Sequence, residues 1–150
     1  MTISWDKYFM DLARAASARS KDRSTKVGCV IVGPDNEIRS TGYNSFPRGI
    51  NDQAEERHQR PEKYLWTEHA ERNAIYAAAR TGTPTNGCRA YLPWFPCMDC
   101  ARALVQAGIT EVVGVRPDTS DAKWGADFIR AETLFKEAGV AVRFVCEEMG

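Results

Sequence analysis

Two separated stretches of this sequence, residues 67–75 and 95–100, carry side chains that gain a joint function only if the fold brings them together. The first contains His69, and the second contains Cys97 and Cys100. One imidazole and two thiolates offer three ligands to zinc, which prefers four in a tetrahedron, so one position stays open for water. This ligand count is typical of a catalytic zinc site, whereas structural zinc sites are closed. We therefore expect the two stretches to meet around one zinc ion per chain.

A carboxylate follows the first predicted ligand, His69, at a distance of two residues. Glu71 can take a proton from a water at the open position and hand it on. The resulting pattern, H-x-E followed by P-C-x-x-C, is a known signature of zinc-dependent nucleobase deaminases, and Pro96 completes it here. In a competing interpretation Cys97 and Cys100 are a redox pair and His69 caps a helix. That interpretation requires several independent elements to coincide by accident.

Length and cysteine usage indicate a single domain spanning residues 1–150, in the cytoplasm. A chain of 150 residues can bury about two thirds of the surface that it exposes when unfolded. The N-terminus has neither a basic leader nor an apolar run, and no stretch approaches the length of a membrane span. Five cysteines are an odd number, and two of them have metal-ligand spacing, so a disulfide framework is not expected. Cys29, Cys88 and Cys146 are expected to be reduced thiols.

The charge balance favours a small substrate over a nucleic acid. Twenty basic and twenty acidic side chains give a formal net charge of zero. A protein that follows a long phosphate backbone usually has a basic excess, because its affinity comes from neutralising many phosphates. We therefore expect no nucleic-acid partner, although a local basic patch remains compatible with the balance.

Hydrophobic periodicity and turn residues predict an alternation of helices and strands. An apolar stripe predicts a helix from Ser4, its N-cap, to about Ser20. The order of elements implies an α/β fold, a three-layer α/β/α sandwich around a mixed five-stranded sheet, with the metal on helix starts at the carboxyl ends of central strands. The remaining expected elements are strands at 27–33, 37–43, 89–92, 111–115 and 140–145, and helices from His69 to Arg80, Pro96 to Gln106 and Ala126 to Ala138.

Two polar segments have more than one interpretation. The charged run from Arg19 to Lys26 is either a solvated loop or a loop that faces a phosphate. The stretch from Asn44 to Thr67 is long for a connection inside a small domain, and such connections usually serve as lids or interfaces.

The chain resembles the cytidine deaminase superfamily over nearly its whole length, and within it the deoxycytidylate deaminases. Beyond the zinc signature, the resemblance rests on Arg19-Ser20-Lys21-Asp22 before Val27-Gly28, Gly42-Tyr43-Asn44 with Pro47, Arg72-Asn73-Ala74-Ile75, and Ala107-Gly108-Ile109. It implies a cytidine deaminase-like fold, with zinc held by His69, Cys97 and Cys100 and Glu71 as the proton shuttle. It also implies that Asn44 contacts the sugar or base of a small nucleotide, with conversion of dCMP to dUMP and ammonia as the leading reaction. Relatives form homo-oligomers from dimers to hexamers.

Further substrate contacts are predicted from charge and aromatic character. A monophosphate carries close to two negative charges and needs basic partners. Trp94, Phe95 and Trp124 are candidates to stack on a base, although aromatic residues belong to the core more often than they form ring platforms. The candidate phosphate partners are Lys21, Arg23, Lys26 and Arg48, each of which can equally be a plain surface charge.

Three alternatives stay open at this stage. In the first, the substrate is another base or nucleoside, such as guanine, cytosine, cytidine or an adenine-type ring. In the second, it is adenosine in transfer RNA. In the third alternative, the chain is not an enzyme but an inactive binding subunit stabilised by zinc, although a structural site has no use for the carboxylate of Glu71.

Two family features depend on single residues of this chain. Members controlled by nucleoside triphosphates usually carry glycine after Gly-Tyr-Asn, where this chain has Ser45, so that control is left open. Some phage relatives hold a second zinc, but His58 is the only spare histidine here.

Overall fold

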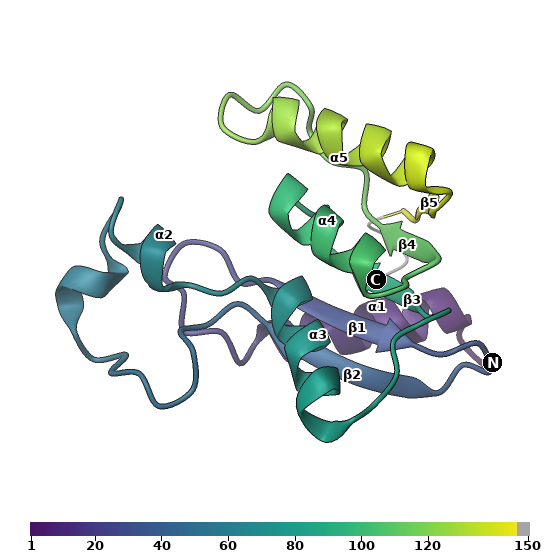
Figure 1. The fold of residues 1–150 in the computed structure, drawn as a ribbon, viewed down its shortest axis with the longest axis horizontal. Coiled ribbons are helices and arrows are strands. Elements are labelled where there is room, and N and C mark those ends of the chain that lie inside the picture. The colour runs from purple at the N-terminus through teal and green to yellow at the C-terminus, as the bar shows by residue number, and fades with distance from the viewer. Residues whose placement is uncertain (147–150) are drawn as a thin grey trace.

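The computed structural model describes residues 1–146, and residues 147–150 of the expected domain lie outside that range. Five strands form one sheet in the order β2-β1-β3-β4-β5. The strands are β1 (Gly28–Val32), β2 (Ile38–Tyr43), β3 (Arg89–Leu92), β4 (Glu111–Gly114) and β5 (Ala141–Phe144). The helices are α1 (Trp5–Ser17), the short 3-10 helix η1 (Glu55–His58), the short α2 (Lys63–Trp66), α3 (Ala70–Thr81), α4 (Met98–Gln106) and α5 (Gly125–Ala138) (Figure 1).

The sheet is mixed, as predicted. β1 pairs antiparallel with β2 and with β3, whereas β3, β4 and β5 are parallel. The hairpin between β1 and β2 closes at Gly33, whose N–H donates to the carbonyl oxygen of Glu37, and Asn36 takes a positive φ of 64° in the turn. α4 and α5 are the crossovers that bring successive strands back in the same direction, because parallel neighbours need a long connection. The fold is therefore the α/β architecture that the sequence predicted.

Helices cover both faces of the sheet and make the three layers. On one face α1 packs through Phe9, Met10 and Ala13 against β1, β3 and β4. On the other face α3, α4 and α5 share a second apolar cluster with the sheet, which includes Ala74, Leu104 and Phe135. All five residues of β1 are buried, as expected for a strand covered on both sides. The face with three helices is the one that carries the predicted zinc ligands.

The helix ends nearest the site differ from the sequence prediction, whereas the end of α3 and the start of α5 differ by one residue each. α1 ends at Ser17 and not near Ser20, because Ser20 leaves the helix and donates its hydroxyl to the carbonyl oxygen of Asn44. α3 begins after His69, which is its N-cap with extended backbone (φ −78°, ψ 155°), and not a residue of the first turn. α4 begins at Met98 and not at Pro96, because Cys97 is also extended, with ψ 173°. Both of these ligands therefore stand at N-cap positions.

The stretch from Asn44 to Thr67 contains η1 and α2 and extends away from the sheet (Figure 1). Its two ends are clipped together, because Ser45 and Glu68 form an isolated β-bridge. The side-chain amide of Asn73 on α3 reinforces this clip by donating to the carbonyl oxygen of Tyr43 at 2.8 Å. The stretch thus leaves and re-enters the body of the protein directly before His69.

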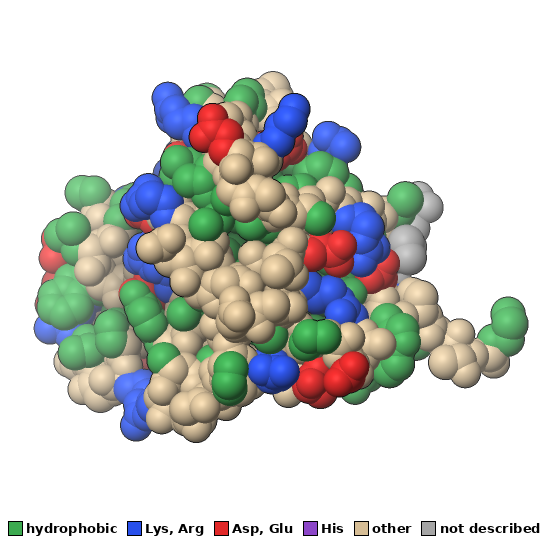
Figure 2. Space-filling view, turned by 45° about the vertical axis from the view of Figure 1, so that its right-hand side comes forward, with side chains coloured by type: hydrophobic (Ala, Val, Ile, Leu, Met, Phe, Trp, Pro, Cys, Tyr) green, Lys and Arg blue, Asp and Glu red, His purple; other side chains and the backbone are tan. Residues whose placement is uncertain are grey.

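The surface shows no single sign of charge on the face seen in Figure 2, where basic and acidic side chains are interspersed. This agrees with the balanced composition. Among the described residues, none of the helices is both long enough and apolar enough to cross a membrane.

Candidate metal centre and its cavity

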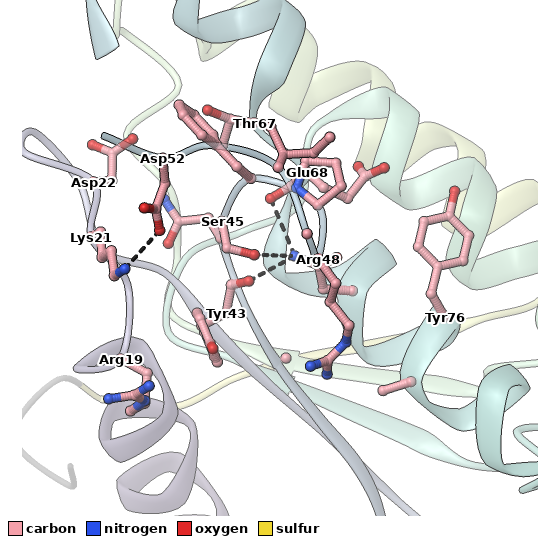
Figure 3. Close-up of a pocket in the computed structure, with 18 of the residues that line it drawn as sticks. Arg19, Lys21, Asp22, Tyr43, Ser45, Arg48, Asp52, Thr67, Glu68 and Tyr76 are labelled. Carbon is pink, nitrogen blue, oxygen red and sulfur yellow. Dashed lines mark hydrogen bonds and ion pairs between the residues drawn. The ribbon is translucent and has the colours of Figure 1, made fainter. Parts of the chain in front are cut away.

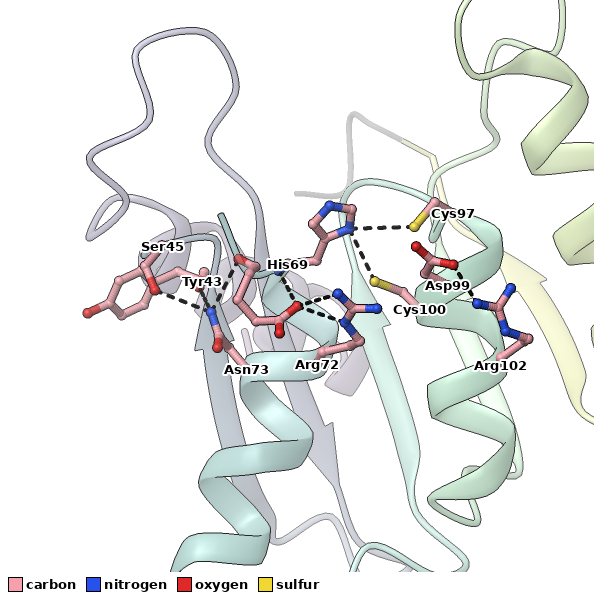
Figure 4. Close-up of polar contacts among 10 residues, drawn as sticks. Tyr43, Ser45, His69, Arg72, Asn73, Cys97, Asp99, Cys100 and Arg102 are labelled. Carbon is pink, nitrogen blue, oxygen red and sulfur yellow. Dashed lines mark hydrogen bonds and ion pairs between the residues drawn. The ribbon is translucent and has the colours of Figure 1, made fainter. Parts of the chain in front are cut away.

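The fold brings the three predicted ligands together at the starts of α3 and α4. Nδ1 of His69 lies 3.5 Å from Sγ of Cys97 and 3.3 Å from Sγ of Cys100 (Figure 4). The three ligand atoms all lie within 4.8 Å of one another. A tetrahedral zinc with ordinary bond lengths separates a nitrogen and a sulfur ligand by about 3.6 Å and two sulfurs by about 3.8 Å. The spacing and the donor set therefore fit zinc, with three protein ligands and one position left over.

Helix geometry explains why the ligands converge. His69 is the N-cap of α3 and Cys97 is the N-cap of α4, and their side chains meet between the two helix starts. Helix starts carry partial positive charge, which favours thiolates and a bound anion. Hydrogen bonds from Cys100 and, less strongly, from His69 lower the pKa of Cys97 to about 4. The hydrogen bond with Cys97 raises the pKa of the Cys100 thiol, so that proton leaves when metal binds.

Glu71 is the second residue of α3 and is buried, with 3% of its surface exposed. Burial, followed by the negative charge of Cys97, raises the pKa of its carboxyl group. Glu71 lines the same cavity as His69 and Cys97 but is not a member of the ligand cluster. A carboxyl group in this position can exchange a proton with whatever occupies the open side of the metal.

The cavity in front of the ligands has a volume of about 550 Å³. That is within the range of roughly 300–1,000 Å³ typical of small-molecule sites. The starts of α3, α4 and α5 make one side of it, and residues from the Asn44–Thr67 stretch make the other. The site is thus a pocket for a small molecule, built where three helix starts meet a long connection.

The other predicted contact residues are divided between the cavity and the core. Asn44 lines the cavity, and its side chain bridges the chain nearby, accepting from Val27 N at 2.8 Å and donating to Thr25 O at 2.9 Å. Trp94 also lines the cavity and is 46% exposed. Phe95 was predicted to stack on a base, but it is only 2% exposed and packs in the core instead of forming a cavity wall. The two rings follow β3 in succession, and one faces out while the next faces in.

The predicted phosphate partners do not line the metal cavity, and three of them border a second cavity that shares Asp22, Asn44, Lys63 and Thr67 with it. Arg48 lines a second cavity of about 530 Å³, and Lys26 is exposed and lines neither cavity. Lys21 and Arg23 border the second cavity too, where Lys21 pairs with Asp52 at 2.6 Å (Figure 3). Arg23 makes a two-pronged contact with Glu55.

The cations that do line the metal cavity escaped the sequence analysis. They come from two segments that are far apart in the chain, so no local pattern marks them as a group. Tyr64 and Lys123 connect these segments across the cavity: the Lys123 ammonium donates to the Tyr64 hydroxyl and lies 4.2 Å from the centre of its ring. The four cations are Arg60, Lys63, Lys123 and Arg130.

Comparisons with known proteins agree with this site. The family model described as the cytidine and deoxycytidylate deaminase zinc-binding region matches residues 3–115. A deaminase of Aliivibrio fischeri described as uncharacterized, in the luxG 3′ region, is 38% identical over 147 residues, which cover 97% of this chain and 96% of that protein. The deoxycytidylate deaminase of Mus musculus is 37% identical over 146 residues, covering 94% of this chain and 79% of the mouse protein. The crystal structure of dCMP deaminase from cyanophage S-TIM5 in complex with dCMP and dUMP superposes with a TM-score of 0.78 at 23% identity, covering 97% and 99% of the two chains.

Proposed function

The chain belongs to the cytidine and deoxycytidylate deaminase family, and on this premise we propose that it converts dCMP and water to dUMP and ammonia. The observation that carries the proposal is the meeting of a zinc-ligand trio with a buried carboxyl group in one cavity. The mouse and human relatives, at 37% and 36% identity over most of this chain, are deoxycytidylate deaminases.

The proposed reaction replaces a carbon–nitrogen bond by a carbon–oxygen bond. His69, Cys97 and Cys100 would hold the zinc, which would lower the pKa of a water at its open position from about 16 to roughly 7 and so supply a nucleophile at neutral pH. Glu71 accepts the proton of this water and delivers it to the ring nitrogen beside the amino-bearing carbon. Glu71 then carries the remaining proton of the new hydroxyl group to the amino group, which leaves as ammonia while the carbonyl group of dUMP forms. One water is consumed and one ammonia released, so atoms and protons balance.

The cavity also supports recognition of a 5′-phosphate. Two of its four acidic side chains are engaged in ion pairs: Asp22 pairs with Lys63 at 3.2 Å and Asp99 with Arg102 at 2.5 Å. Within residues 1–146, Arg60, Lys123 and Arg130 form no ion pair with a carboxylate. These three cations can meet the two charges of a monophosphate, which a free base or nucleoside lacks.

Two further contacts remain proposals on the residues chosen from the sequence. We propose that Asn44 contacts the sugar or base, because it lines the cavity and its amide group carries a second hydrogen besides the one donated to Thr25. Trp94 is a candidate to stack on the base, because it is half-exposed on the cavity wall.

Ammonia release from a panel of substrates tests the proposal. The panel contains dCMP, CMP, deoxycytidine, cytosine, guanine and AMP, at equal concentrations and with zinc supplied. Highest kcat/KM for dCMP is expected. Turnover of a purine with none of dCMP would refute the proposal, and no turnover of any compound by zinc-loaded protein would favour an inactive binding subunit. A transfer RNA substrate would be distinguished by binding that weakens steeply with added salt, since several phosphates are contacted at once.

We also propose that the chain works in the cytoplasm as a homo-oligomer of between two and six subunits. Large apolar side chains on the surface, among them Trp5, Leu65, Tyr76 and Ile129, support self-association because water-exposed apolar area favours burial. Light scattering coupled to size-exclusion chromatography gives the molar mass directly. A monomer at micromolar concentration would refute the assembly.

A further inference from the structure

Both sulfur ligands depend on the first turn of α4. Cys97 is the N-cap and Cys100 is the third residue of the helix. The first N–H groups of any helix lack intrahelical partners, so acceptors must come from outside. A side chain at the N-cap serves the N–H groups of the second and third helical residues, so the N–H of Met98, the first residue of α4, needs an acceptor from elsewhere. Some other group must therefore hold the start of α4 in place if its sulfurs are to point at one metal.

That group is supplied by α5. Oδ2 of Asp127 accepts a hydrogen bond from the backbone N–H of Met98 at 2.8 Å. This N–H belongs to the peptide that joins Cys97 to Met98, and a peptide group is planar. Fixing its N–H direction therefore holds the peptide plane that ends at the Cα of Cys97, and so restrains the backbone from which the thiolate projects.

The position of Asp127 is itself tightly determined. Its neighbour Phe128 is 4% exposed and packs edge-on against Phe95 at 6.1 Å between ring centres. Two residues earlier, Gly125 is so close to the loop before α5 that a Cβ there would lie 2.2 Å from the carbonyl oxygen of Thr119. The first turn of α5 thus has little freedom to shift, which makes it a rigid support for the start of α4.

We propose that Asp127 is a positioning residue for zinc, which holds the Cys97 thiolate in ligand geometry from a separate helix. Its carboxylate complements the partial positive charge at the start of α4, and hydrogen bonds to a charged acceptor are stronger than neutral ones. This role of Asp127 concerns metal binding, so it does not depend on which substrate the protein uses. Partners that orient metal ligands typically contribute about 10- to 100-fold in metal affinity.

The test measures metal binding by three variants. Asp127→Ala removes the acceptor, Asp127→Asn keeps an oxygen acceptor without the charge, and Glu137→Gln alters an exposed carboxylate on the same helix as a control. Zinc affinity is measured by competition with a chromophoric chelator. Cobalt(II) is substituted in parallel, because the thiolate-to-cobalt absorption band reports the geometry around the sulfurs.

The expected result is a loss of about 10- to 100-fold in zinc affinity for Asp127→Ala, together with a shifted cobalt absorption band. Asp127→Asn should lose less than tenfold and keep the band near its wild-type position, and the control should behave as wild type. Wild-type affinity and an unshifted band in Asp127→Ala would overturn the proposal. So would a change confined to KM for dCMP, which would make Asp127 a substrate contact instead. If Asp127→Ala does not fold, the isosteric Asp127→Asn decides: a measurable loss of zinc affinity below about tenfold supports the proposal, and an affinity equal to that of the wild type overturns it.

Discussion

Replacement of Gly42 by alanine tests how closely α3 must rest on the sheet for the site to form. Gly42 is buried in β2, and a Cβ there would lie 2.3 Å from the carbonyl oxygen of Ala70 and 2.5 Å from the backbone nitrogen of Ala74. Ordinary van der Waals contact begins near 3.4 Å. Both opposing atoms are backbone, so no side-chain rotation relieves the overlap. Either α3 or β2 must move by about 1 Å.

The consequences follow from what α3 carries. Overpacking of this kind costs about 1–3 kcal/mol of stability. For a protein of this size, each kcal/mol lowers the melting temperature by about 3 °C, so a loss of roughly 3–10 °C is expected. The same shift moves His69 and Glu71, which stand at the start of α3. A misplacement of about 1 Å at reacting groups costs on the order of 100-fold in rate.

Three measurements separate these effects: thermal unfolding, zinc content, and ammonia release from dCMP. Gly114→Ala is the matched control, because it adds the same methyl group to a buried glycine of β4, where the nearest contact is the Leu92 carbonyl oxygen at 3.1 Å. That variant should lose far less stability and little activity. A Gly42→Ala protein with wild-type melting temperature and turnover would refute the argument that α3 is clamped on β2.

Three further predictions address the chemistry, the phosphate and a charged network. Glu71→Ala should retain about one zinc per chain by elemental analysis and lose nearly all turnover of dCMP, and an active variant would reject the proton-shuttle role. Lys123→Ala should raise KM for dCMP about tenfold, which corresponds to the loss of one charged hydrogen bond, and leave KM for deoxycytidine unchanged. Equal changes in both KM values would show that Lys123 does not recognise the phosphate. Hydrogen bonds from Arg143 and Tyr91 hold the pKa of Asp6 below its ordinary value, so this stabilisation is present above that value and is lost as the pH falls through the lowered pKa. Asp6→Asn should therefore cost about 1 kcal/mol near pH 7 in urea unfolding and less as the pH falls through the lowered pKa of Asp6, and a loss that does not vary with pH would contradict the assignment.

The metal centre could be predicted from sequence because its chemistry is local. His69 and Glu71 lie on one helix start, and Cys97 and Cys100 on another, so each half of the site is a short motif whose spacing has meaning by itself. The strands could also be predicted from the sequence. β3, for example, is a mainly apolar run bounded by turn residues, and its bounds were predicted correctly.

The rest of the site depends on which segments the fold brings together. Lys123 reaches the cavity only because the loop before α5 lies opposite α2, and no pattern within either segment signals this. The pair Trp94 and Phe95 shows a second reason. Composition marks both as possible ring platforms, but the direction of each side chain after β3 decides that Phe95 fills the core. The bond from Met98 to Asp127 joins helices 29 residues apart in the chain.

The substrate side of the cavity is held by a series of bonds that begins at one nearly buried ion pair. Asp22 and Lys63 are each only 12% exposed at the side chain, so their attraction is screened less than that of the exposed pairs Lys21–Asp52 and Arg23–Glu55. Asp22 also accepts from the backbone of Ser24 and Thr25 at 2.8 and 3.0 Å, and hydrogen bonds from these two N–H groups and from Lys63 outweigh burial and keep its pKa below the ordinary value. The carbonyl oxygen of Thr25 in turn accepts from Asn44. Lys63, Asp22, Thr25 and Asn44 therefore form one connected unit across the cavity wall, in which α2 and the proposed sugar contact are fixed by the same carboxylate. The charged run from Arg19 to Lys26 resembles an ordinary solvated loop in the sequence, yet it contributes to the site through this unit. Its acidic residue, Asp22, lines the metal cavity, whereas its basic residues do not.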